Sequence, residues 1–425
     1  MQGRNKGEKM QAGEIKVCKA RLNQFIMPIG DVIEKTKAIC EPLKATIKKR
    51  DTIAIAVGSR GITGIKKITK AVVEYIKELG ADVFVVPAMG SHGGATAEGQ
   101  KAVLNEYGVT EEYIGCPIRS SMEVEQIGQV EGEDSFPVYF DKNALSADGV
   151  VVINRVKAHT DFHGLHESGI VKMLVIGLGK HKQALTMHRF GADGLSRLIP
   201  IAAKKVLDTV NILGGLAIVE DGMDNTSQIV FASPGEFLKV DSTLLQRSKE
   251  IMAKLPFSKI DLLVVDEMGK NISGTGLDTN VIGRLRIKGQ QDATPDCDRI
   301  AVLDLTDASH GNATGIGLPD IVTEKVLSKV DWKATNENVI TSGFYERGFL
   351  PLVVENDKVA IEIGSRGNYD TNTIRFARIK NTLELSTVYL SKPLMEELEL
   401  SGLGERIGEY EELSFIDGKI KVFED

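Results

Sequence analysis

Residues 149–191 read GVVVINRVKAHTDFHGLHESGIVKMLVIGLGKHKQALTMHRFG, and the rest of the chain is organised around this stretch. It begins with the apolar run Val150–Ile153, which is typical of a buried strand. Five of the seven histidines in the protein follow, at positions 159, 163, 166, 181 and 188. Because imidazole binds metals and moves protons near neutral pH, a strand that opens into clustered histidines predicts a functional site rather than a solvated loop.

Two β-loop-α units precede this stretch. They comprise a strand Thr52–Val57, a loop Gly58–Gly64 and a helix Ile65–Leu79, then a strand Asp82–Pro87, a loop Ala88–Gly94 and a helix from Thr96, its N-cap, to Tyr107. Repeated units of this kind build parallel sheets, whose ligands bind beyond the carboxyl ends of the strands. With residues 149–154 as a third strand, we expect three strand ends to meet, which makes Arg60 and His92 site candidates.

The second half of the chain again alternates strands and helices. We expect helices at 199–210, 242–255, 319–330 and 392–400, strands at 215–220, 228–232, 261–266, 300–305, 359–363, 373–379 and 383–390, and a hairpin that turns at Asp417-Gly418. The segment Gly58-Ser59-Arg60-Gly61 recurs as Gly364-Ser365-Arg366-Gly367, which predicts an arginine at a strand end in both places.

A length of 425 residues exceeds one ordinary core, so the pattern predicts an α/β protein with two α/β domains and mostly parallel sheets. We place an N-terminal domain at residues 1–245, against which residues 400–425 can pack back, a connector helix at 246–258 and a C-terminal domain at 259–399.

Composition excludes several classes of protein. With 52 basic and 59 acidic residues the net charge is −7, which gives no electrostatic reason to expect a nucleic acid or a membrane as partner. The four cysteines are far apart and include no C-x-x-C pair, which fits a reducing cytoplasm better than a disulfide framework. No apolar run approaches the ~20 residues that span a bilayer. We therefore expect a cytoplasmic protein, and self-association stays open.

Two local patterns support different chemistries. The spacing His159-x3-His163-x2-His166 could bind zinc, with Glu167 or Asp161 as a fourth ligand, and would then indicate a zinc-dependent hydrolase. The series Gly58-x2-Gly61-x2-Gly64 before a helix could bind an anion, which would suit a nucleotide-binding protein without catalysis. No G-x-S-x-G segment is present to indicate a serine hydrolase.

The chain resembles a known family at four places. These are Gly58-Ser59-Arg60, Gly90-Ser91-His92, Lys172 and His188. Together they are similar to the nickel-pincer-nucleotide racemases and epimerases typified by lactate racemase. The sequence departs from the lactate racemase pattern at Val57, where an aspartate is usual, and at Gly93, where an arginine is usual.

The resemblance implies a cofactor and a set of roles. The cofactor is nickel held by a pyridinium-3,5-bisthiocarboxylic acid mononucleotide, attached at Lys172, with His188 as the protein ligand to nickel. The further residues implied are, for cofactor binding, Ser168, Gly169, Ser59 and Gly61, for general base catalysis His92 and His159 (with His163 as a rival to His159), and for the substrate carboxylate Arg60 and Lys270. The site would lie in the cleft between the domains, with the N-terminal domain carrying the cofactor and the C-terminal domain closing over the substrate.

The implied reaction is the racemisation or epimerisation of a small 2-hydroxy acid through a 2-oxo acid. The α-hydrogen is too weakly acidic for an ordinary side-chain base, whereas oxidation needs only a hydroxyl proton removed and a hydride acceptor. Malate is the first substrate expected, because Arg155, Arg284 and Arg366 could receive a second carboxylate; lactate, 2-hydroxyglutarate and sugar acids stay open. Proteins that make the cofactor and insert nickel are the expected partners.

Overall fold

The computed structural model describes residues 11–58, 61–367 and 370–421. The chain forms two compact units. The central unit is Phe25–Met252, and the terminal unit combines Met1–Gln24 with Ala253–Asp425. The division after Met252 falls inside the connector that the sequence analysis placed at 246–258.

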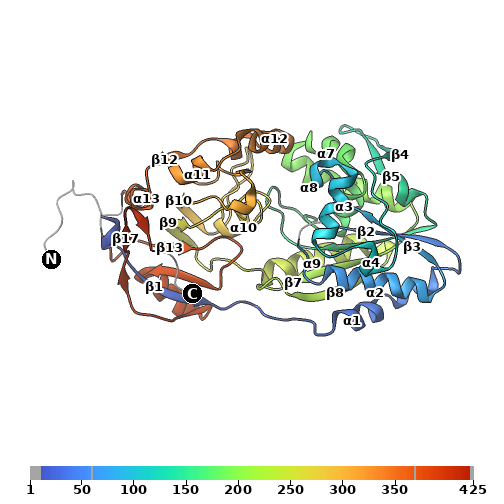
Figure 1. Ribbon diagram of the computed structural model, residues 1–425, viewed down its shortest axis with the longest axis horizontal. Helices are drawn as coiled ribbons and strands as arrows, with labels where there is room; N and C mark the ends of the chain where they lie inside the picture. Colours follow the sequence, from blue (N-terminus) through green and yellow to red (C-terminus); the bar gives the residue numbers. More distant parts are fainter. Residues whose placement is uncertain (1–10, 59–60, 368–369, 422–425) are drawn as a thin grey trace. The chain divides into compact units, whose positions relative to one another are not determined.

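The central unit is built on a five-stranded sheet in the order β3-β2-β6-β7-β8. Figure 1 labels β2, β3, β7 and β8. Its strands are β2 (Thr52–Val57), β3 (Asp82–Pro87), β6 (Gly149–Arg155), β7 (Ile212–Glu220) and β8 (Thr226–Ala232). The first four run parallel and β8 pairs antiparallel with β7. Because β3, β2 and β6 are neighbours, their carboxyl ends lie side by side, as the sequence pattern predicted.

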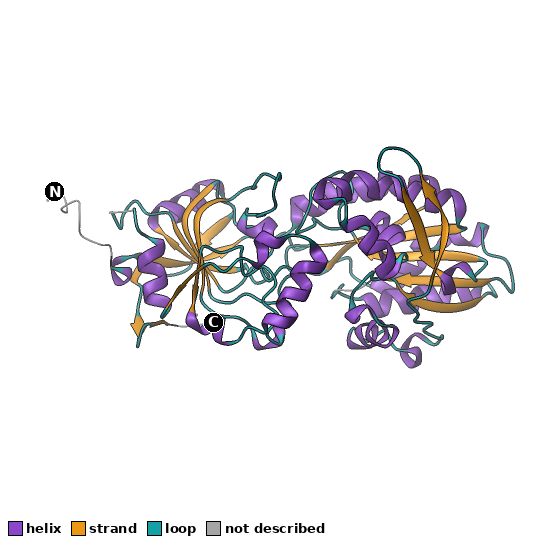
Figure 2. Ribbon diagram, turned by 90° about the horizontal axis from the view of Figure 1, so that it is seen from above, coloured by secondary structure: helices purple, strands orange, loops and turns teal. Residues whose placement is uncertain are grey.

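Helices flank this sheet (Figure 2). They are α1 (Val32–Ile39), α2 (Ile65–Glu78), α3 (Ala97–Glu106), α4 (Glu111–Ile114), α5 (Lys142–Leu145), α6 (Ile170–Lys172), α7 (Lys180–His188), α8 (Gly191–Thr209) and α9 (Phe237–Ile251). Apolar residues recur in α2 at the three- and four-residue spacing of one helix face, and Ile65, Ile68, Val72 and Ile76 are all buried in the core. Thr96 caps α3 as predicted, because its hydroxyl accepts a hydrogen bond from the backbone N–H of Gly99 at 3.0 Å.

A two-stranded hairpin and a π-helical turn complete the central unit. The hairpin pairs β4 (Val124–Val130) with β5 (Phe136–Asp141). The π-helical turn η4 (Met173–Gly177) joins α6 to α7, and turns of this kind are frequent at functional sites. Neither feature carries a clear sequence signal.

The terminal unit contains a nine-stranded sheet in the order β12-β11-β10-β9-β13-β14-β1-β15, with β16 also paired to β1. Its strands are β1 (Lys16–Leu22), β9 (Lys259–Val265), β10 (Asp296–Val302), β11 (Ile321–Thr323), β12 (Leu352–Val354), β13 (Phe376–Ile379), β14 (Thr387–Ser391), β15 (Gly404–Arg406) and β16 (Glu411–Glu412), with a separate hairpin of β17 (Phe415–Ile416) and β18 (Lys419–Ile420). The run from β12 to β13 is parallel and the strands beyond it are antiparallel.

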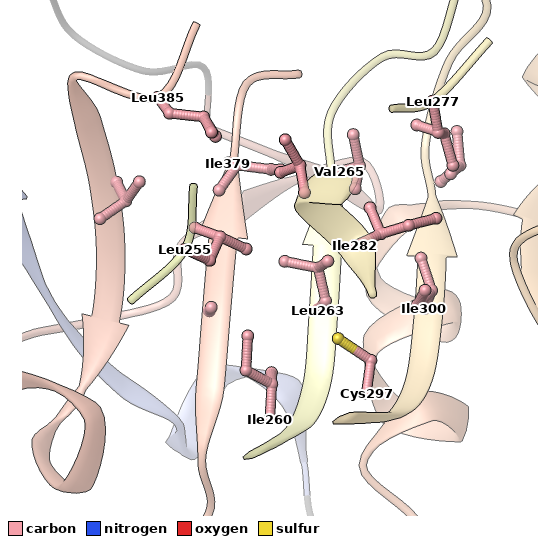
Figure 3. Packing of buried hydrophobic residues seen from close by; sticks show 14 of the residues in the cluster. Leu255, Ile260, Leu263, Val265, Leu277, Ile282, Cys297, Ile300, Ile379 and Leu385 are labelled. Atoms are coloured by element: carbon pink, nitrogen blue, oxygen red, sulfur yellow. The ribbon is translucent and has the colours of Figure 1, made fainter. Parts of the chain in front are cut away.

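The helices of the terminal unit are α10 (Thr279–Ile282), α11 (Glu324–Ser328), α12 (Trp332–Ser342), α13 (Asp357–Gly364) and α14 (Lys392–Ser401). One face of its sheet packs in a core to which Leu263 and Val265 of β9, Ile300 of β10 and Ile379 of β13 contribute (Figure 3). Mixed α/β units with mostly parallel sheets confirm the predicted fold class.

The terminal segments differ from the predicted division of the chain. Residues 16–22 form β1, which pairs with β14, a strand more than 360 positions later in the chain. In Figure 1 the blue β1 lies among red C-terminal strands. Residues 404–406 and 411–412 pair with β1 as well, so these C-terminal residues pack on the terminal unit rather than back on the N-terminal domain, which the sequence had left possible. Strand pairing between the two chain ends leaves no signal in a single sequence.

Two predicted elements are wrong. The helix expected at 319–330 is instead β11 followed by α11, because Ile321–Thr323 pairs with both β10 and β12. The strand expected at 359–363 is part of α13, which begins where Asn356 accepts a hydrogen bond from the N–H of Val359 at 3.1 Å. Consequently Arg366 follows a helix and not a strand, and the repeat of Gly58-Ser59-Arg60-Gly61 has no structural counterpart there.

None of the helices in the described residues is long and apolar enough to cross a membrane.

Candidate active site

A pocket of about 180 Å³ opens where β2, β3 and β6 end. It is lined by Gly58, Ala88, Met89, Ser91, His92, Asn154, His159, Asp161, Phe162, Ser168, Lys172, Met173, Ile176, Gly177, Ala184, His188 and Leu195. All of these residues belong to the central unit. The pocket therefore unites the strand-end loops with the histidine-rich stretch on which the sequence analysis opened.

One wall of the pocket is the segment from α6 to α7. Lys172 is the last residue of α6, and His188 is the last residue of α7. Between them η4 packs tightly against the loop after β3, since a Cβ at Gly177 would lie 2.8 Å from the carbonyl oxygen of Ala88. The glycine allows this close approach, which places the end of β3 against the wall.

His188 presents an imidazole with an unused nitrogen. Its Nδ1 is buried and has no hydrogen-bond partner among the described residues. Burial lowers the pKa of His188, and the nearby charge of Lys172 lowers it further, which favours the neutral form of the ring. A neutral imidazole with a free lone pair is a good ligand for a borderline metal ion such as nickel.

His159 is held in place by four groups. Its backbone N–H donates to the Glu167 carboxylate at 2.7 Å, and its Nδ1 accepts from the backbone N–H of Asp161 at 3.0 Å. The ring stacks on Phe162 with 4.5 Å between ring centroids. Its Nε2 is hydrogen-bonded to the amine of Lys172. His159 and Lys172 are thus direct neighbours, although they are thirteen positions apart in sequence.

His92 lies in the loop that follows β3. Its backbone N–H donates to the carbonyl of Met89 at 3.1 Å. The next residue, Gly93, has a φ of +65°, and a Cβ there would lie 2.5 Å from the backbone carbon of Gly99. A residue with a side chain would therefore collide with α3. The packing of the loop on α3 excludes an arginine here, the residue usual at this position in the lactate racemase pattern.

Of the further predicted cofactor-binding residues that the structure describes, one lines the pocket and two do not. Ser168 lines the pocket, and its backbone pairs with Lys157. Gly169 and Gly61 do not line it: a Cβ on Gly169 would lie 2.0 Å from the Asp241 carboxylate, and Gly61 is exposed. Ser59 and Arg60 lie outside the described residues.

The remaining cationic candidates lie away from the pocket lining. Lys270 belongs to the terminal unit, where its amine donates to the carbonyl of Gly274 at 2.7 Å and to Asn338 at 3.2 Å. Arg155 forms an ion pair with the buried Glu220, and Arg284 is buried against Asp320 at 2.5 Å. Arg366 is exposed. The side chains of Arg155 and Arg284 are therefore engaged by carboxylates of the protein itself.

The predicted zinc cluster does not assemble. His166 is directed to Asp241, with its Nδ1 3.0 Å from the carboxylate, and His163 lies 3.4 Å from Glu167. His159 faces Lys172 instead. In residues 11–58, 61–367 and 370–421, no group of three or more His, Cys, Asp or Glu side chains is placed to hold a metal ion.

Several residues of the pocket were not predicted from sequence. Asn154, the penultimate residue of β6, donates from its side chain to the carbonyl of Gly169 at 2.8 Å. Phe162 lines the pocket beside His159, as does Asp161, which the sequence had suggested only as a zinc ligand, and Met173 and Ile176 line it from the π-helical turn. A polar residue ending an apolar strand could have marked Asn154; the others carry no signal of their own.

Comparisons with known proteins give a domain family for part of the chain and a similar fold. The lactate racemase N-terminal domain family matches residues 27–194. The structure of the lactate racemase apoprotein from Thermoanaerobacterium thermosaccharolyticum matches with a TM-score of 0.52 and 14% sequence identity, over 84% of this chain and 95% of that chain. At that identity the second match bears on the fold alone.

A further match is short. The ATP-dependent RNA helicase MAK5 of Saccharomyces cerevisiae (strain YJM789) is 37% identical over 75 residues, which are 16% of this chain and 9% of the helicase. The chain thus spans only a small part of that relative's length. Residues 27–194 therefore match the lactate racemase N-terminal domain family, and the fold of the chain is similar to that of the lactate racemase apoprotein.

Proposed function

We propose that the protein is a racemase or epimerase of a small 2-hydroxy carboxylic acid that uses a nickel pincer nucleotide. The observation that carries the proposal is His188, whose buried Nδ1 has no hydrogen-bond partner among the described residues. It lines the same pocket as Lys172, His92 and His159. Family and fold support this assignment.

The residues present fit such a cofactor. A pincer nucleotide brings most of the donor atoms for its nickel, so it needs one protein ligand and not a cluster. His188 would supply that ligand, Lys172 would supply the amine for attachment, and Ser168 would add a hydroxyl at the pocket wall; all three residues line the pocket. The bound group would supply the hydride acceptor that makes a transient 2-oxo acid accessible.

The two histidines of the pocket would move the hydroxyl proton. His92 comes from the loop after β3, and His159 from the segment after β6. In one direction of the reaction, one histidine would remove the proton from the α-hydroxyl. The other, on the opposite face of the reacting carbon, would return a proton to the carbonyl oxygen. A reaction that interconverts mirror images requires a base for each face.

The substrate is a small 2-hydroxy acid, and malate is the first to test. Of the three arginines that suggested a second carboxylate, Arg155 and Arg284 are bound to Glu220 and Asp320. Lactate, 2-hydroxyglutarate and sugar acids should therefore be assayed beside malate. Arg60 and Lys270 are the proposed carboxylate-binding residues, and Arg60 lies outside the described residues.

The test is to produce the protein together with the cofactor-synthesis and nickel-insertion proteins. We expect nickel in the purified protein, a mass increase on the peptide that contains Lys172, and racemisation of at least one of the acids. Lys182, an exposed lysine on α7, provides the matched control: Lys182→Met should keep the nickel and the adduct. Absence of both nickel and the mass increase would falsify the proposal.

Two variants separate the roles of the lysine and the metal ligand. His188→Ala should lose nickel, because the outer ligand that holds the metal in the protein is removed. Lys172→Ala should lose the covalent adduct and can still retain some cofactor through its phosphate. Equal nickel contents in the wild type and His188→Ala would exclude His188 as the ligand.

A further inference from the structure

A buried lysine lies behind the loop that carries His92. Lys180 is the first residue of α7, and its side chain is completely buried. Its φ is +55°, in a region that residues other than glycine rarely adopt. The amine donates to the carbonyl of Pro87, the last residue of β3, and to the side-chain oxygen of Gln100 at 3.1 Å.

Gln100 extends this contact to the rest of the loop. Its side chain is fully buried in α3, and its amide group donates to the carbonyl of Gly90 at 2.8 Å and to that of His92 at 3.4 Å. Lys180 and Gln100 together therefore bind three backbone carbonyls between Pro87 and His92. Buried carbonyls need donors, so the pair determines how this loop can fold.

The charge of Lys180 is balanced inside the protein. Asp141, also fully buried, lies 3.2 Å from the amine and caps α5 by accepting from the N–H of Ala144 at 2.8 Å. Burial lowers the pKa of Lys180 and raises that of Asp141, and their mutual attraction opposes both shifts. A buried ion pair of this kind adds little stability compared with apolar residues, which suggests that it is kept to fix a geometry.

We propose that Lys180, acting through Gln100, is the positioning residue that holds His92 in the wall of the pocket. The proposed function uses His92 as a general base, and the consequence for turnover rests on that proposed function. The structural part does not, because it concerns only the placement of the His92 ring. Lys180 lies away from the pocket lining and touches the loop from behind.

The test uses two variants that remove the contacts in different ways. The double variant Lys180→Met with Asp141→Asn removes the ion pair without leaving a buried charge, and asparagine can still cap α5. Gln100→Leu removes the bonds to Gly90 and His92 but keeps the Lys180–Asp141 pair. Lys182→Met, on the exposed side of the same helix, is the control.

The readout is the NMR spectrum of histidine-labelled, cofactor-free protein. The chain has only seven histidines, and His92→Gln identifies the signal of interest. In both test variants we expect the imidazole signal of His92 to shift or broaden, while those of His159 and of His310 in the terminal unit stay as in the wild type. Lys182→Met should leave the signals of His92, His159 and His310 unchanged.

The inference is overturned if His92 keeps its wild-type signal in the folded variants, or if His159 shifts as much as His92. In loaded protein, the variants should lower kcat by up to about 10²-fold with KM and nickel content unchanged, as expected when a catalytic group is misplaced by ~1 Å. If the NMR shift appears in a protein that racemises no acid, the positioning role stands and the proposed function fails.

Discussion

Two loops present the two proposed bases, and they are held by opposite charges. The loop that ends at His92 turns its carbonyls inward, to Lys180 and Gln100. The loop that begins at His159 turns its amides inward, to Glu167, which accepts from His159 at 2.7 Å and from Gly164 at 3.1 Å. Each buried charge has a partner of opposite sign.

The partners are Asp141 for Lys180, and Lys249 of α9 for Glu167 at 2.6 Å. We call Lys180 and Glu167 the anchors of the two loops. The difference teaches that the backbone groups facing the anchor decide its charge, because carbonyls require a donor and amides require an acceptor. It also predicts that each loop can be disturbed without the other.

The largest effect should come from removing the bases themselves. His92→Ala and His159→Ala should each lower racemisation in both directions by about 10²–10⁴-fold, because a positioned general base contributes that much. Each variant should still allow one enantiomer, and not the other, to reduce the bound cofactor. The change in cofactor absorbance on mixing with D or L substrate separately checks this. If both variants respond alike to both enantiomers, the two are not an opposed pair, and His163 is the next residue to replace.

The second effect comes from the anchor of the His159 loop. Glu167→Gln removes the charge that holds two backbone amides and Lys249, so we expect turnover to fall by up to about 10²-fold through misplacement of His159. In labelled, cofactor-free protein the His159 signal should shift and the His92 signal should not, the reverse of the Lys180→Met and Asp141→Asn result. The exposed Lys239→Met on the same helix as Lys249 is the control. A shift of both histidines would show that the loops are coupled.

The third effect is on stability and concerns the His92 loop alone. Gly93→Ala should destabilise the protein by about 1–3 kcal/mol, because its φ is +65° and the new Cβ would meet the Gly99 backbone at 2.5 Å. Gly94 has a φ of +64° but open space around its Cβ position, so Gly94→Ala should cost less. Urea unfolding of the two variants measures the difference. Equal losses would mean that the close approach to Gly99 costs nothing.

The smallest effect is a pH dependence expected of the anionic anchor. Burial alone would raise the pKa of Glu167, but hydrogen bonds from His163, Lys249 and the His159 backbone together hold it below its usual value. A carboxyl with a lowered folded-state pKa stabilises the protein fully above its unfolded-state pKa, and that contribution is lost as the pH falls through the folded-state pKa. The difference in unfolding free energy between wild type and Glu167→Gln should therefore shrink in acid. A difference independent of pH would argue against an ionised Glu167.

The sequence was sufficient to predict the framework of the central unit. Strands at 52–57 and 82–87 and the helix from Ile65 were predicted closely, because apolar periodicity, glycine-rich turns and an N-cap are local signals. Because β3, β2 and β6 are neighbours in the sheet, the segments that follow them meet, and His92, His159, Lys172 and His188 line one pocket. The roles of these residues are still proposals.

Only the tertiary structure decided what holds those residues. The contacts of Glu167 with Lys249 and of Lys180 with Pro87 and Gln100 join positions about 80 or more apart, and no local pattern indicates them. The pairing of β1 with the C-terminal strands, and the engagement of Arg155 by Glu220, are long-range in the same way. Periodicity reports which face of an element is buried, whereas the partner of a buried charge depends on which elements the fold brings together.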